Sequence, residues 1–189
     1  MKNIMFGFVF IMLICTLAAC LAPPAGKGVV QSNEQVRMIL DQLGELQTSE
    51  GALVKEMLQR PRVFDDENLR GFPENRSQLE MIATQQIGTL EKIIELKEAQ
   101  ILKVNEIAAL PVEKPFRDIT ANTSRSFEKS LEMRRLDVQT FRLILDPNIT
   151  VREDLEARNL PFENRRKEID REVEALEKER LEIKRPEDR

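Results

Sequence analysis

The stretch IGTLEKIIELKEAQILKV, residues 87–104, decides the fold because its apolar side chains recur every three or four positions. That spacing predicts an α-helix with one apolar face, whereas a strand would show alternating β-branched residues, which are missing along the chain. Lys97 interrupts the apolar face. It is either an amine with a lowered pKa or, as is far commoner and as we expect, a long side chain that reaches solvent along the helix edge. The apolar face comprises Ile87, Leu90, Ile94, Ile101 and Val104, and Leu79, Ile82 and Ala83 extend it backwards.

The same pattern continues on both sides of this stretch, and prolines divide it into four long pieces. The predicted helices cover about residues 32–59, 73–109, 116–146 and 161–185. Ser32 and Gln35 have capping-box spacing at the first start, and the apolar pattern stays in register across Gly51. The sequence therefore predicts an all-α antiparallel bundle of about four long helices with coiled-coil-like character, formed by residues 32–189 as one domain.

Two connections between the predicted helices look alike. Residues 60–80, RPRVFDDENLRGFPENRSQLE, and residues 145–169, LDPNITVREDLEARNLPFENRRKEI, each contain a proline, a short helical turn and a second proline. In both, Phe then lies beside Glu-Asn-Arg at the start of a long helix. A duplicated helical hairpin explains this similarity, and so does the general preference of helix starts for proline and acidic residues.

The N-terminus has the features of a secretory signal. Lys2 precedes an apolar run over residues 4–17, which ends in Leu17-Ala18-Ala19-Cys20. This tetrapeptide resembles the lipobox of bacterial lipoproteins. The resemblance implies a signal peptide over residues 1–19, cleavage between Ala19 and Cys20, and lipidation of Cys20. Residues 20–31, rich in proline and glycine, are then a flexible tether.

The resemblance also implies a location in the bacterial cell envelope. A lipidated Cys20 anchors the chain durably to a membrane surface, because two or more acyl chains bind far more stably than one. In lipoproteins of this kind, an Asp after the cysteine favours the inner membrane. Leu21 occupies that position, so we expect the outer membrane, with the domain facing the periplasm.

Composition excludes several function classes. The chain has 29 basic and 33 acidic side chains, no His, Trp or Tyr, and two Cys, both within the signal segment and lipobox. A net acidic chain is a poor nucleic-acid binder, because contact with phosphates needs a basic surface. Without a usable thiol or His, and without glycine-rich phosphate loops, we expect no cofactor, no metal and no enzymatic activity.

The remaining expectation is a protein that binds or positions another envelope protein, with a self-associating spacer as the alternative and a carboxylate- or lysine-based enzyme last. The fourth predicted helix has the narrowest apolar face. Its end therefore supplies the predicted partner contacts, which are Leu176, Arg180, Leu181 and Ile183. Arg134 and Arg166 interrupt apolar faces, and they either pair with carboxylates between helices or line a polar groove.

Overall fold

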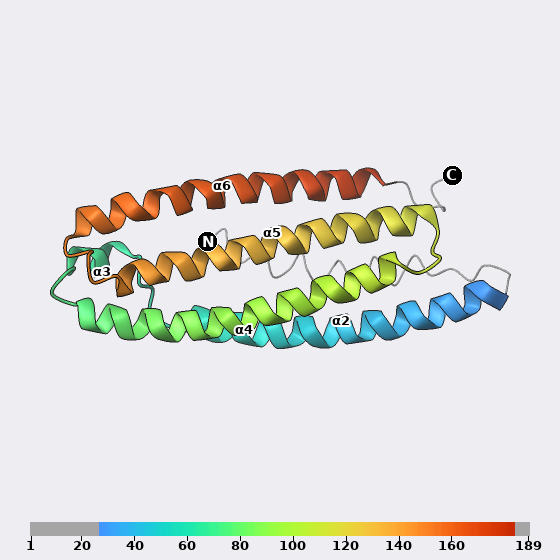
Figure 1. Cartoon of the computed structure of the whole chain (residues 1–189), viewed down its shortest axis with the longest axis horizontal. Helices are drawn as coiled ribbons and strands as arrows, with labels where there is room; N and C mark the ends of the chain where they lie inside the picture. Colours follow the sequence, from blue (N-terminus) through green and yellow to red (C-terminus); the bar gives the residue numbers. More distant parts are fainter. Residues whose placement is uncertain (1–26, 184–189) are drawn as a thin grey trace.

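The computed structural model describes residues 27–183, and all regular structure in that range is helical. The all-α prediction is therefore confirmed. Residues 27–183 form four long helices and the short α3. The long helices lie side by side, with α3 at one end of the molecule (Figure 1). The helices are α2 (Lys27–Gln59), α3 (Asp66–Arg70), α4 (Arg76–Ala108), α5 (Lys114–Leu145) and α6 (Arg152–Glu182).

The long helices pack in chain order. The main contacts join α2 to α4, α4 to α5, and α5 to α6, so α2 and α6 form the two edges of the array. The chain reverses direction in two short connections, at residues 109–113 between α4 and α5 and at residues 146–151 between α5 and α6. Helix α4 therefore has two neighbours, which requires a broader apolar face than an edge helix needs.

This broader face changes which residues of α4 are buried. Leu79, Ile82, Ala83, Leu90 and Val104 are buried as predicted, while Ile87, Ile94 and Ile101 are only half-buried. Ile93 and Ile107 are fully buried instead. The sequence predicted one apolar face, which suits a helix packed on one side. Helix α4 instead contacts both α2 and α5, so more of its surface is buried.

The core consists of two clusters of buried apolar residues. The first joins α2 to the end of α4 and the start of α5. The second joins the α2–α4 connection and the start of α4 to the end of α5, the connection after it and the start of α6. The first cluster contains Val36, Leu40, Leu43, Val104, Ile107, Phe116, Ile119 and Phe127. The second contains Val63, Phe72, Leu79, Ile82, Ala83, Ile144, Ile149 and Leu155.

Helix α2 begins at Lys27, five residues before the predicted start, and it continues through Gly51 as predicted. The prediction of a flexible tether is therefore wrong for residues 27–31, which belong to α2. Ser32 lies inside the helix rather than at its N-cap. The prolines of this segment end at Pro24, and a glycine inside a helix costs only about 1 kcal/mol, so neither Gly28 nor Gly51 ends it. The signal segment, Cys20 and the rest of the tether lie outside the described residues.

The predicted start of the last helix, at about residue 161, is also wrong. Helix α6 starts at Arg152 and runs through Pro161 without a break. Proline inside a helix costs about 3 kcal/mol. Leu155 and Asn159, which lie in this first part of α6, are buried, whereas Pro161 is exposed. In the other connection, α3 and α4 are separate helices, so the two similar sequences adopt different local structures.

Arg76 fixes the start of α4 to the α5–α6 connection. Its Nη1 donates to the carbonyl of Ile149 at 2.5 Å, and its Nη2 donates to the carbonyl of Asp146 at 2.7 Å. The guanidinium also lies 5.9 Å from the ring centre of Phe72. A cation beside the C-terminal end of α5 is favoured by the helix dipole. These contacts hold the point at which α6 turns back along α5.

Candidate functional site

A cavity of about 470 Å³ lies among the C-terminal end of α2, the connection that follows it, the second half of α5 and the middle of α6, and Gln86 of α4 also lines it. Its volume falls in the range of about 300–1,000 Å³ typical of ligand sites. The cavity lies between the edge helices, which do not pack closely on each other at this end. Its apolar lining includes Val54, Met57, Leu58, Val63, Phe64, Met133, Phe141, Ile169 and Val173.

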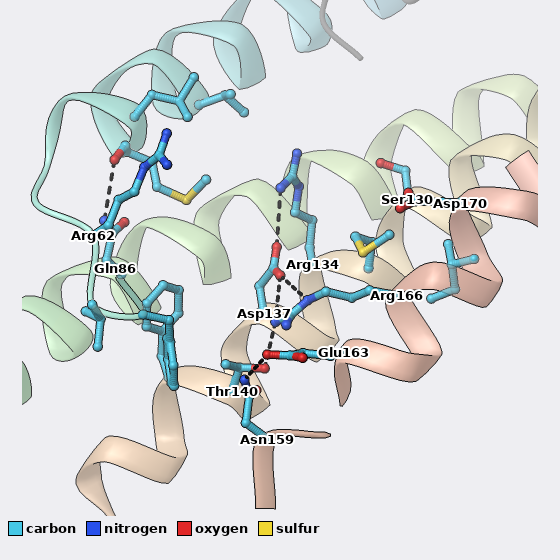
Figure 2. A pocket seen from close by; sticks show the side chains of 18 of the residues that line it. Arg62, Gln86, Ser130, Arg134, Asp137, Thr140, Asn159, Glu163, Arg166 and Asp170 are labelled. Atoms are coloured by element: carbon cyan, nitrogen blue, oxygen red, sulfur yellow. Dashed lines mark hydrogen bonds and ion pairs between the residues drawn. The ribbon is translucent and has the colours of Figure 1, made fainter. Parts of the chain in front are cut away.

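An ion-pair network crosses the cavity wall from α5 to α6, as Figure 2 shows. Asp137 accepts from two arginines: Arg134 Nη1 lies 3.3 Å from its Oδ2, and Arg166 Nη2 lies 3.0 Å from its Oδ1. Arg166 also donates to the Thr140 hydroxyl at 2.6 Å. The two roles expected for Arg134 and Arg166 both apply, since these side chains pair with a carboxylate and line the cavity.

Three buried polar atoms in the cavity wall have no hydrogen-bond partner among the described residues: Gln86 Oε1, Arg134 Nε and Asn159 Oδ1. Gln86 and Asn159 are only 4% and 7% exposed. The amide nitrogen of each side chain does form a hydrogen bond: Gln86 Nε2 donates to the Met57 carbonyl at 3.4 Å, and Asn159 Nδ2 donates to Glu163 at 2.8 Å. An unsatisfied buried group costs about 1–3 kcal/mol, so we take the cavity whose wall holds three of them as the candidate binding site.

Asp170 adds a carboxylate to the α6 side of the cavity. Burial raises the pKa of this group, and the charge of Glu174 raises it further. Glu163 and Asp137 already accept from Asn159 and from the two arginines. The surroundings of Asp170 therefore favour its protonated form.

A second polar group lies in the core, where Lys97 is only 1% exposed. Its Nζ lies 2.8 Å from Glu50 Oε2 and 3.1 Å from Gln100 Oε1, and 4.9 Å from the ring centre of Phe127. The prediction that Lys97 reaches solvent is wrong, because neighbouring helices cover both edges of α4. Burial lowers the pKa of the amine, against the raising effect of Glu50.

Lys97 and Glu50 do not line the cavity, so the buried pair is separate from the candidate site. The pair joins α4 to α2, and Gln100 Nε2 strengthens it by donating to Glu50 at 2.9 Å. A buried charge with a well-placed partner fixes the register of two helices, because any slip would leave the charge unpaired. We assign this group a structural role.

The comparisons with known proteins found nothing similar. No protein-family model, no curated protein and no solved structure matches the chain. Within residues 27–183, no helix combines the length and apolar character that crossing a membrane requires. In the same range, no group of three or more Cys, Asp or Glu side chains is arranged to hold a metal ion.

The predicted partner contacts at the end of α6 have different environments. Leu181 is 77% exposed, whereas Ile183 packs against the first core cluster. Leu176 is half-buried and its carbonyl accepts from Asn122 at 2.9 Å. The side chain of Arg180 is 13% exposed and lies 3.9 Å from Glu177. These four residues therefore do not form one exposed apolar surface.

The cavity residues of α6 lie earlier in the helix and were not predicted as a site. Asn159, Glu163 and Asp170 are polar residues in a densely charged sequence, which is typical of an exposed helix face. Gln86 likewise looks like a surface residue between apolar positions. Arg166 was the one signal on α6, since its position within the apolar pattern indicated a polar contact between helices.

Proposed function

We propose that the protein is a lipid-anchored component of the bacterial cell envelope whose helical domain binds another envelope protein without catalysing a reaction. The lipobox sequence supports the anchor at Cys20 and a location at the outer membrane facing the periplasm. The observation that carries the binding role is the cavity between α2, α5 and α6, with its three unsatisfied polar atoms.

The chemistry of the cavity favours binding over catalysis. Two of its three carboxylates are held by Arg134, Arg166 and Asn159, which leaves them poorly placed to exchange protons with a substrate. The amine with a lowered pKa, on Lys97, lies in the core and outside the cavity. A lysine- or carboxylate-based enzyme is therefore the least favoured function.

Site-specific cross-linking in cells tests the binding role. A photoreactive residue at Leu58, which is 62% exposed and lines the cavity, should cross-link to a different protein. The same residue at Leu102, which is 64% exposed on α4 away from the cavity, is the matched control. Equal products from both positions, or none from Leu58, would contradict a partner at the cavity.

Self-association is the alternative function, and the exposure of Leu181 near the end of α6 supports it. A photoreactive residue at Leu181 should then give a product of twice the mass of the chain. We expect little of this product if the cavity is the main binding surface. A dominant Leu181 dimer together with no Leu58 product would favour the spacer.

The anchor has a separate test. Replacing Cys20 with Ser removes the thiol that the lipobox resemblance assigns to lipidation, so the longer precursor should accumulate and incorporation of labelled palmitate should be lost. Fractionation of the unmodified protein should place it with the outer membrane. A Cys20→Ser chain that matures to the normal size and still incorporates palmitate would contradict the lipobox.

A further inference from the structure

We propose that the cavity binds an extended segment of the partner protein that is apolar and carries one carboxylate. This inference rests on the proposed function and specifies the chemistry of the partner. It follows from the charge of the cavity, its apolar walls and the kind of hydrogen-bonding atoms that it leaves unsatisfied.

The charged side chains of the cavity favour an anion. Its lining includes five basic side chains and three carboxylates, those of Asp137, Glu163 and Asp170. Arg60 and Lys129 already form ion pairs with Glu56, Glu132 and Glu172, which lie outside the lining. The excess positive charge therefore lies on Arg62 and on the two arginines that share Asp137, Arg134 and Arg166. Arg134 has a buried Nε without a partner, although its Nη1 pairs with Asp137. Arg62 is exposed beside the cavity. A carboxylate near Arg134 would satisfy the unpaired Nε through a charge-assisted hydrogen bond.

The apolar walls require a ligand with apolar side chains. Met57 and Leu58 of α2 face the cavity from one side, and Met133 of α5 and Val173 of α6 face it from the other. Burial of apolar area stabilises a complex by roughly 25 cal/mol per Å². Methionine side chains adapt their shape to a ligand more easily than branched ones. A simple inorganic anion would leave this surface in water.

The two unsatisfied acceptors distinguish a peptide from a lipid. Gln86 Oε1 and Asn159 Oδ1 both need a donor. An extended peptide has a free backbone N–H at almost every residue, whereas a fatty acid or its ester has apolar chains and acceptor oxygens. A peptide segment therefore has both the donors that the two amides need and, in an acidic side chain, the acceptor that Arg134 needs, whereas a lipid with a carboxylate or phosphate has only acceptors.

The same acceptors, together with the cavity volume, favour an extended segment over a helix. Helical N–H groups are used within the helix after the first turn. A helix about 10–12 Å across fills roughly 400–600 Å³ per turn, so 470 Å³ holds about one turn. The cavity is therefore suited to a short segment rather than to a long helix lying along α2 and α6.

A phage-displayed random dodecapeptide library tests the proposal, panned against the full-length lipidated protein in detergent micelles. Enriched peptides should share apolar residues and one Asp or Glu. A synthetic peptide of the consensus sequence should bind at least about tenfold more weakly to an Arg134→Met variant, because a charge-assisted hydrogen bond is lost. Replacing its acidic residue by the corresponding amide should weaken binding to a similar extent.

Arg135→Met is the matched control. Arg135 is the next residue of α5, pairs with Glu98 at 2.7 Å and does not line the cavity, so this variant should bind the peptide within about twofold of the original protein. Val173→Phe is the second variant, since it reduces the cavity volume without removing a charge. It should also weaken binding at least about tenfold, through steric exclusion of the peptide.

Three results would overturn the proposal: consensus peptides without an acidic residue, equal binding by the Arg134→Met and Arg135→Met proteins, or no enriched peptide. Displacement of a bound fluorescent fatty acid by oleate, dependent on Arg134 and without any peptide binding, would identify a lipid site instead. If no peptide binds but the Leu58 cross-link to another protein persists in the Arg134→Met variant, the proposed function stands and this binding mode is wrong.

Discussion

Replacing Glu50 with Gln removes the carboxylate that faces the buried amine of Lys97 and nearly preserves its size. The 2.8 Å ion pair is then lost, while Lys97 stays only 1% exposed. Breaking a buried ion pair in this way costs about 3–5 kcal/mol, because a buried charge is left without its partner. Deprotonation of Lys97 limits this loss. An amine with the ordinary pKa of 10.5 gives up its proton at a cost of about 1.36 kcal/mol for each pH unit below that value. At pH 7 this cost is about 5 kcal/mol, and the loss of stability cannot exceed it.

The pH dependence has a defined sign. Burial lowers the pKa of Lys97 in the folded protein below the value of 10.5 that applies in the unfolded chain. Between these two pKa values the unfolded chain binds more protons, so the free energy of unfolding rises with pH. Glu50 raises the pKa of Lys97, so its loss lowers this pKa further in the folded protein. The free energy of unfolding of the Glu50→Gln variant should therefore rise more steeply with pH, at a slope approaching about 1.36 kcal/mol per pH unit.

Urea denaturation followed by circular dichroism at pH 7 and pH 9 measures both effects. Glu95→Gln, at an exposed position of α4, is the control and should change the free energy of unfolding by less than about 0.5 kcal/mol. The double variant Glu50→Leu/Lys97→Met should recover most of the loss, because no buried charge remains. A loss below about 1 kcal/mol for Glu50→Gln, unchanged between the two pH values, would refute the buried pair.

Two further substitutions test the core and the end of the array. Leu90→Ala should lower the free energy of unfolding by about 2–5 kcal/mol because Leu90 is fully buried, whereas Leu102→Ala, at an exposed site, should cost under about 1 kcal/mol in thermal denaturation. Arg76→Met should cost about 2–4 kcal/mol in the same measurement, since buried carbonyls of the α5–α6 connection lose a charged donor; an unchanged melting temperature would contradict this role.

The fold class was predictable because apolar residues of period 3.6 form each long helix. Leu79, Leu90 and Val104 were correctly placed in the core from this pattern alone. The pattern could not show that α4 has neighbours on two sides, which explains the burial of Ile93 and Ile107. It also could not show whether Pro161 would end a helix, since that depends on burial of Leu155 and Asn159 earlier in α6.

The candidate site was less predictable than the fold. Gln86 and Asn159 have no feature that distinguishes a buried amide from an exposed one, because their burial depends on helices distant in the sequence. Lys97 shows the same limit: a lysine within an apolar pattern usually reaches solvent, and its partner Glu50 lies 47 positions away on α2. Arg134 and Arg166 were recognisable because they interrupt apolar faces, but their shared partner Asp137 was not.

Packing in chain order has a consequence for how the protein folds. Each long helix pairs mainly with the helix next to it in sequence, so no large interface has to join the first helix to the last. Chains whose contacts are local lose less entropy in reaching the folding transition state, and helical bundles of this kind typically fold in microseconds to milliseconds. Helix α2 can therefore pair with α4 during synthesis, before α6 has been made.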